Sequence, residues 1–118
     1  MQVSITFRHM TASEALREHV DARINSLQKY FIKPIEIHAV LSVEKIRHRA
    51  EVVLHEQNFK ASADEVSDDM YKSIDKALDR IESQVKKHKA KAQEHHKGHS
   101  GLSDIAALAE KKFDKIQG

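Results

Sequence analysis

Basic side chains gather in the C-terminal third of this chain, at spacings that put them on one side of a helix. At about 100° per residue, five of them share a single sector of the helix surface: Lys72, Lys76, Arg80, Lys87 and Lys91. Lysine and arginine in such a row neutralise phosphate groups and release the counterions around them. The chemistry that this pattern favours is therefore the binding of a polyanion.

The charge of the chain is unevenly distributed, although its formal net value is only +2. Residues 36–69 carry four basic and eight acidic side chains, whereas residues 70–97 carry eight basic and four acidic ones. Cations near the end of a helix also stabilise its dipole, and lysines keep a surface helix solvated. The concentration of positive charge nevertheless indicates a docking surface for a polyanion.

Cysteine and glycine usage excludes several classes of protein. The chain has 118 residues and no Cys, so it has no disulfide framework, thiolate zinc site or cysteine nucleophile. Its three Gly lie at positions 98, 101 and 118, so the first 97 residues hold no glycine loop for a nucleotide phosphate. GxSxG and HExxH motifs are also missing. We therefore expect a protein that is not an enzyme and has no cofactor.

Targeting segments and a metal site are not expected either. The apolar runs are far shorter than a membrane span, and the alternating N-terminal segment does not resemble a signal peptide. This predicts a cytoplasmic protein that does not bind membranes. The chain has nine histidines, of which four cluster late: His88, His95, His96 and His99. No carboxylate or thiolate set completes a site around them, so solvated histidines are favoured over a metal centre.

A strand and a helix are predicted before Pro34, and they must position the basic residues of the N-terminal part of the chain. Residues 2–8 alternate between apolar and polar, which predicts a strand. Thr11 and Glu14 match a capping box, and apolar residues then recur every three or four positions. A helix is therefore expected over residues 12–30, and it carries Arg17, Arg23 and Lys29.

Three further strands and a second helix are expected after Pro34. Apolar alternation returns over 35–43, 50–54 and 59–63, with a tight turn at Glu56-Gln57-Asn58 in which Asn tolerates a left-handed conformation. Ser67 or Asp68 can cap a helix over 68–91, whose apolar stripe runs from Met70 to His88. The predicted fold is α+β, in the order β-α-β-β-β-α, with two helices packed on one face of a four-stranded sheet.

The chain changes character after Lys97. Residues 1–97 form the predicted folded domain, and 98–118 form a tail that begins with the glycine-containing joint 98–101. Apolar residues from Leu102 to Ile116 favour a short amphipathic helix, and a tail that is disordered when free is the alternative.

Several motifs resemble the ribosome hibernation promoting factor family, which includes the ribosome-associated inhibitor called protein Y. The segment DMYKSIDKALDRI at 69–81, continued by QVKKHK at 84–89, is similar to the second helix of that family. EALRE at 14–18, VEK at 43–45 and LH at 54–55 match in the same order. The resemblance extends from Met1 to about Lys91.

The resemblance implies a non-enzymatic factor of stress or stationary phase that binds the small ribosomal subunit and the 70S ribosome. It would contact 16S rRNA across the A and P sites, compete with tRNA and mRNA, inhibit translation, and be monomeric when free. Together with the helical row, it implies RNA contacts at Arg23, Lys29, Lys76, Arg80, Lys86, Lys87, Lys89 and Lys91. Ser26 and Ser83 stand where relatives often carry a basic residue.

Two other functions are compatible with the residues alone. A general module for double-stranded RNA would also use a basic helix, and would bind arbitrary duplexes equally. A protein-interaction domain acting through the tail helix would be indifferent to RNA. A sheet without an aromatic pair disfavours a third arrangement, in which bases stack on the strands.

Overall fold

The computed structural model describes residues 1–97. The chain divides into two units, Met1–Val85 and Lys86–Gly118, and the division falls inside the last helix. The predicted tail over 98–118, including its amphipathic segment, lies outside the described residues.

The order of elements is the predicted β-α-β-β-β-α, with one short 3-10 helix added after the first α-helix. The elements are β1 (Gln2–Arg8), α1 (Glu14–Asn25), η1 (Gln28–Tyr30), β2 (Glu36–Glu44), β3 (Arg47–Glu56), β4 (Phe59–Ser67) and α2 (Met70–Lys97).

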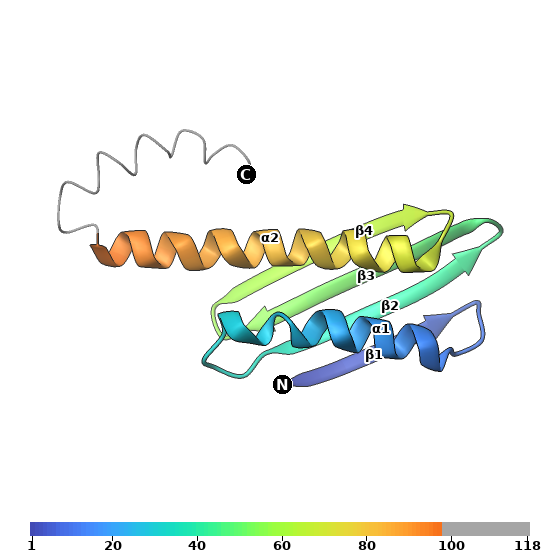
Figure 1. The fold of residues 1–118 in the computed structure, drawn as a ribbon, viewed down its shortest axis with the longest axis horizontal. Helices are drawn as coiled ribbons and strands as arrows, with labels where there is room; N and C mark the ends of the chain where they lie inside the picture. Colours follow the sequence, from blue (N-terminus) through green and yellow to red (C-terminus); the bar gives the residue numbers. More distant parts are fainter. Residues whose placement is uncertain (98–118) are drawn as a thin grey trace. The chain divides into compact units, whose positions relative to one another are not determined.

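The four strands form one mixed sheet in the order β1-β2-β3-β4. β1 and β2 are parallel because α1 connects them, whereas the hairpins β2-β3 and β3-β4 are antiparallel. α1 and the part of α2 up to Val85 cover the same face of this sheet, as Figure 1 shows. The predicted α+β fold is confirmed.

The core lies between this sheet face and the two helices. Alternate residues of β2 and β3, such as Leu41 and Leu54, are buried against the stripe of α1 around Ile24 and the stripe of α2 around Leu78. Because strand side chains alternate, Thr6 and Glu51 belong to the opposite face, which no helix within residues 1–97 covers. The apolar periods in the sequence therefore identified the core-facing side of each element.

The predicted cap of the first helix was wrong by two residues. Ser13, not Thr11, occupies the N-cap position, and its Oγ accepts a hydrogen bond of 3.2 Å from the amide of Leu16. The α-helix ends at Asn25, and η1 continues the predicted helical segment to Tyr30. Ser26 contributes to this break, because its hydroxyl donates to the carbonyl of Arg23 at 2.7 Å.

The second helix begins later and ends later than predicted. Asp69 provides the N-terminal side-chain bond, with its Oδ1 2.9 Å from the amide of Tyr71. Neither predicted candidate has this role, because Ser67 bonds to Asp69 and Ser73 while Asp68 pairs with Lys72. α2 extends to Lys97, so the basic residues that follow Val85 all lie on one continuous helix.

The left-handed backbone positions also differ from expectation. Gln57 and Asn58 form the predicted turn between β3 and β4, but Asn58 does not have a positive φ. Among the described residues, positive φ occurs at His9 (55°) and at Lys45 (60°). Lys45 is the first of the two residues that connect β2 to β3.

Candidate nucleic-acid interface

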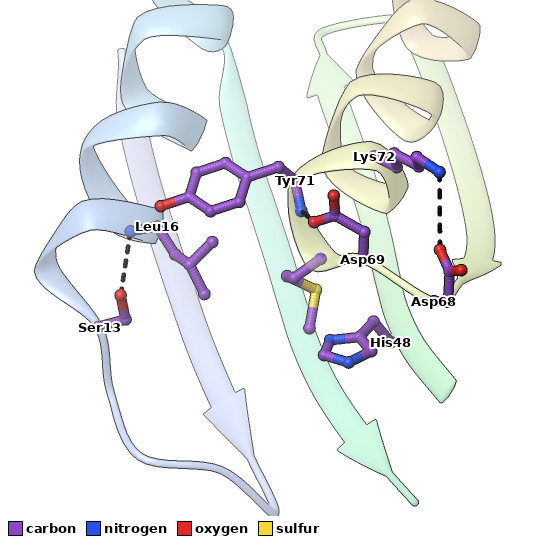
Figure 2. Close-up of a pocket in the computed structure, with 8 residues that line it drawn as sticks. Ser13, Leu16, His48, Asp68, Asp69, Tyr71 and Lys72 are labelled. Atoms are coloured by element: carbon purple, nitrogen blue, oxygen red, sulfur yellow. Dashed lines mark hydrogen bonds and ion pairs between the residues drawn. The ribbon is translucent and has the colours of Figure 1, made fainter. Parts of the chain in front are cut away.

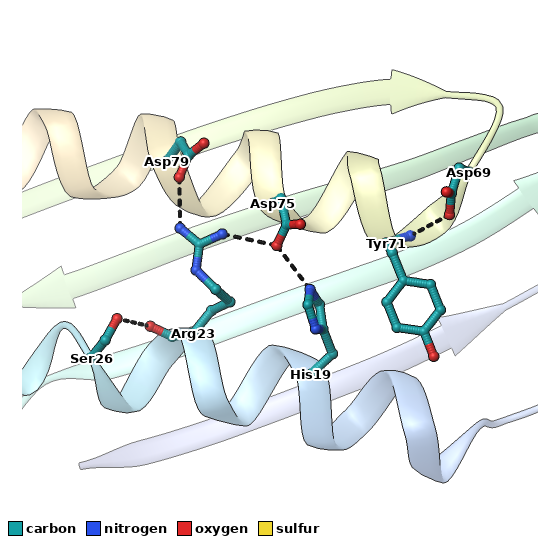
Figure 3. Close-up of polar contacts among 7 residues, drawn as sticks. All are labelled: His19, Arg23, Ser26, Asp69, Tyr71, Asp75 and Asp79. Carbon is teal, nitrogen blue, oxygen red and sulfur yellow. Dashed lines mark hydrogen bonds and ion pairs between the residues drawn. The ribbon is translucent and has the colours of Figure 1, made fainter.

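α1 and α2 lie side by side on the sheet and are joined by polar side chains (Figure 3). Arg23 of α1 donates from Nη1 to Oδ1 of Asp75 at 2.8 Å and from Nη2 to Oδ1 of Asp79 at 2.6 Å. Nε2 of His19 lies 2.8 Å from the same oxygen of Asp75. One carboxylate of α2 is therefore shared by two side chains of α1.

A fourth contact joins η1 to α2, about one turn beyond Asp79. The hydroxyl of Tyr30, in η1, donates to Oε2 of Glu82 at 2.9 Å. We refer to these six residues as the inter-helix network: His19, Arg23, Tyr30, Asp75, Asp79 and Glu82.

The pKa values in the inter-helix network follow from these contacts. Burial alone raises the pKa of Asp75, but the hydrogen bonds from His19 and Arg23 outweigh it and hold that pKa below its usual value. Burial opposes the charge of Arg23, yet Asp79 and Asp75 raise its pKa. Burial and the contact with Glu82 raise the pKa of Tyr30. Asp75 is therefore held as a carboxylate and Arg23 as a charged guanidinium, whereas the hydroxyl of Tyr30 keeps the proton that it donates to Glu82.

This arrangement changes the electrostatics of α2. Asp75, Asp79 and Glu82 follow one flank of α2 at spacings that would let them offset basic residues of their own helix. Instead, all three have partners from α1 or η1. Their negative charge is directed towards the seam between the helices, so it repels a polyanion less than free carboxylates would.

The two predicted arginine contacts both have carboxylate partners. Arg23 bridges Asp75 and Asp79, and its side chain is only 26% exposed. Arg80 pairs through Nε with Glu65 of β4. Sequence spacing gave no sign of either pairing, because neither has the i,i+4 separation of a helix pair.

The predicted lysines of the first unit are more accessible. Lys76 is exposed and has no ion pair among the described residues. Lys29 is exposed, with Nζ 5.4 Å from the ring centroid of Tyr30. Lys72 belongs to the row of basic residues on α2, and its Nζ lies 3.6 Å from Oδ1 of Asp68.

The part of α2 that follows Val85 carries the remaining predicted contacts. Lys86, Lys87 and Lys91 are exposed, and Lys89 is partly buried. All four lie on α2, and Lys86, Lys87 and Lys89 also make interactions within the chain. The structure thus places a run of lysines along the second half of one helix.

A shallow cavity of about 600 Å³ lies where the N-terminal ends of α1 and α2 meet β3 (Figure 2). Its lining residues are Ser13, Leu16, His48, Asp68, Asp69, Met70, Tyr71 and Lys72. Tyr71 is 41% exposed and meets the ring of His19 edge-on at 5.0 Å, so it is not a core residue, whereas Met70 is buried. The exposure of Tyr71 leaves its ring available to stack on a base.

Metal binding and membrane crossing find no support in the described part of the chain. No three His, Asp or Glu side chains among the described residues are grouped as metal ligands require. His95, His96 and His99 are not among the described side chains. None of the described helices combines the length and the apolar character of a membrane span.

Comparisons with known proteins agree on one family. The model of the family described as Sigma 54 modulation protein / S30EA ribosomal protein matches residues 3–93. The ribosome hibernation promoting factor of Escherichia coli K12 is 37% identical over 95 residues, which are 80% of this chain and all of that protein. The protein of the same name from Azotobacter vinelandii is 32% identical over 98 residues, 83% of this chain and 92% of that one.

Solved structures with the same fold carry related names. The N-terminal domain of Thermus thermophilus Protein Y superposes with a TM-score of 0.71 at 28% identity, over 75% of this chain and 99% of that one. A ribosomal subunit interface protein from Coxiella burnetii gives a TM-score of 0.66 at 27% identity, over 76% and 99% of the two chains.

Proposed function

Because this chain belongs to the Sigma 54 modulation protein / S30EA ribosomal protein family, we propose that it is a ribosome hibernation factor. In this proposal it binds the small ribosomal subunit, alone or within the 70S ribosome, at the A and P sites of the mRNA and tRNA channel. It acts in the cytoplasm by occupying that channel and carries out no chemical reaction. Relatives named as hibernation promoting factors and as a subunit interface protein support this proposal.

The observation that carries the proposal is the run of exposed lysines on α2 beside an acidic flank that is already paired. Lys76, Lys86, Lys87 and Lys91 are exposed on this helix. Asp75 and Asp79, which would repel phosphates if free, are bound by Arg23. The helix therefore offers cations to 16S rRNA without an equal number of free carboxylates beside them.

The same contacts define how the helices meet folded RNA. Contacts to phosphates carry little sequence information, so recognition depends on the shape of the RNA and on the spacing of the cations. The inter-helix network joins α1 to α2 around Asp75 and Asp79, and joins η1 to α2 at Glu82. It therefore helps to hold the backbone that carries Lys29 in place against the backbone that carries Lys76.

We assign phosphate binding chiefly to the lysines: Lys29, Lys76, Lys86, Lys87, Lys89 and Lys91. Arg23 and Arg80 remain predicted contacts, with a smaller share. A guanidinium that already holds one or two carboxylates presents less net charge to a phosphate. We assign Arg23 in addition the task of positioning α1 against α2.

The direct test is sedimentation through a sucrose gradient with purified small subunits and with 70S ribosomes. We expect the protein to comigrate with both, and added tRNA to displace it. The variant Lys86→Glu/Lys87→Glu should lose most of this binding, because it reverses two adjacent exposed charges. Its matched control is Lys33→Glu/Lys60→Glu, which changes the net charge equally at exposed positions outside α2 and should still bind.

The alternatives predict other outcomes. A module for any double-stranded RNA would bind arbitrary duplexes as tightly as small subunits, and tRNA would have no special effect. A protein-interaction domain would not comigrate with subunits at all. Equal loss of binding in the control variant would mean that total charge, rather than the lysines of α2, determines the affinity.

A further inference from the structure

The turn between β2 and β3 has side chains that its backbone does not favour. It consists of two residues, Lys45 and Ile46, between the ladder pair Glu44 and Arg47. Lys45 has φ of 60° while Ile46 has no positive φ, which is the pattern of a type II′ turn. Glycine is preferred at the first position of such a turn, because a Cβ is strained there. A lysine at this position therefore needs a reason other than turn stability.

Ile46 is equally unexpected as a structural residue. Ile46 is 77% exposed, so it contributes little to the core. β-branched residues are poor choices for tight turns, where Asn, Asp, Ser and Gly are preferred. The turn thus holds an aliphatic side chain in water at the end of a hairpin.

Two of the three charged side chains next to Ile46 are cationic. Lys45 and Arg47 are exposed, and neither has an ion pair among the described residues. Glu44 is the partner of Arg47 in the β2-β3 ladder, but their side chains form no ion pair. We call Lys45, Ile46 and Arg47 the hairpin tip.

Arg49, the next arginine along β3, is held by ion pairs, unlike Arg47. Arg49 contacts Glu51 at 2.9 Å and also holds Asp64, so its charge is offset twice. Arg47, two residues earlier on the same strand, lines a depression of about 360 Å³ whose other charged or titratable lining residues are His9, Glu44, Arg49 and Asp64. The free positive charge therefore increases towards the turn, which lies at the end of the sheet where β1 ends and α2 begins (Figure 1).

We propose that the hairpin tip is a second RNA-binding element, separate from the lysines of α2. Lys45 and Arg47 bind phosphates of an unpaired RNA strand, and Ile46 packs against the base or ribose between them. Apolar side chains inserted against bases and flanked by cations are a recurrent way to grip nucleic acid. This inference rests on the proposed function, because the RNA in question is that of the small ribosomal subunit.

The test uses a variant that improves the turn while removing its side chains. Lys45→Gly/Ile46→Asn restores the residue types preferred in a type II′ turn. We expect it to melt at or above the temperature of the unmodified protein and to bind small subunits about tenfold more weakly. The slope of log affinity against log salt should become less steep, by the amount expected for about one phosphate contact.

The loop before β2 offers a matched control. Ile32 and Lys33 are also adjacent and exposed, and Ile32→Asn/Lys33→Gly removes the same two side-chain types. This control should bind like the unmodified protein. A photoreactive amino acid at position 46 should crosslink to 16S rRNA in the bound complex.

The outcomes separate this inference from the proposed function. If the unmodified protein binds subunits and the tip variant binds equally well, the hairpin tip is not an RNA contact, whereas the hibernation function stands. A crosslink from position 46 to a ribosomal protein, with none to RNA, overturns the choice of partner. If the unmodified protein does not bind subunits, both proposals fail together.

Discussion

Arg23 on α1 and Asp75 on α2 form a hydrogen-bonded ion pair of 2.8 Å, although 52 positions separate them in the sequence. The same guanidinium reaches Asp79 at 2.6 Å, and His19 reaches the shared oxygen of Asp75 at 2.8 Å. The contact joins the two helices that carry the predicted RNA-binding residues. It therefore links the stability of the fold to the geometry of the interface.

Loss of the Arg23 side chain should destabilise the protein moderately. Arg23→Ala leaves Asp75 with His19 alone and Asp79 without its partner, so we expect the free energy of unfolding to fall by about 1 kcal/mol. Urea denaturation followed by circular dichroism measures this change. Lys29→Ala is a suitable comparison, because Lys29 lies over the ring of Tyr30 and has no ion pair among the described residues, and it should change stability by less.

The contribution of Asp75 should depend on pH in a defined direction. Its contacts lower its folded pKa below the unfolded value of about 3.9. The carboxylate therefore stabilises the fold fully above that value, and the contribution is lost as the pH falls through the folded pKa. Unfolding of the unmodified protein and of Asp75→Asn should differ at pH 6 and converge at the lowest pH values. A difference that grew below pH 4 would contradict this assignment.

Gln84 should contribute to stability and should protect the exposed edge of the sheet from association. Its amide donates to the carbonyl of Ser62 at 2.7 Å and accepts from the amide of Ser62 at 3.1 Å, which satisfies backbone groups of the edge strand β4. We expect Gln84→Met to fill similar space, lower stability by about 1 kcal/mol and promote association through the exposed edge. Light scattering at increasing concentration measures association. Ser83→Met, at a neighbouring exposed position, should leave the protein monomeric.

Binding to the small subunit should weaken steeply with salt. Each phosphate neutralised by a lysine contributes about 0.7 to 0.9 to the slope of log affinity against log salt. Lys76→Ala and Lys87→Ala should each reduce the slope by one such step, measured by filter binding between 50 and 200 mM salt, a range over which the effect is large. Arg23→Ala should reduce it by less, because Arg23 is engaged with two carboxylates. Identical slopes for the unmodified protein and its three variants would show that these lysines do not bind phosphates.

Most of the fold was predictable because each element has its own period. The alternation of Ile37, Ala39 and Leu41 and the helical recurrence of Ile74, Leu78 and Ile81 both identified buried faces that the structure confirms. Helix ends were predicted less well, since Ser67, Asp68 and Asp69 are all acceptable caps and the choice depends on contacts with Ser73 and Lys72. The order and apolar faces of the elements were therefore clearer than their boundaries.

The sequence by itself determined that the cations are concentrated on one helix, since their spacing in a regular helix requires no knowledge of other elements. Tertiary structure decided which of them are available. Arg23 and Arg80 meet Asp75, Asp79 and Glu65 only when α1, α2 and β4 pack together, and ion pairs form between groups that are near in space, whatever their separation along the chain. The free charge at the β2-β3 turn emerged in the same way, because it depends on which carboxylates the folded sheet brings to Arg49 and not to Arg47.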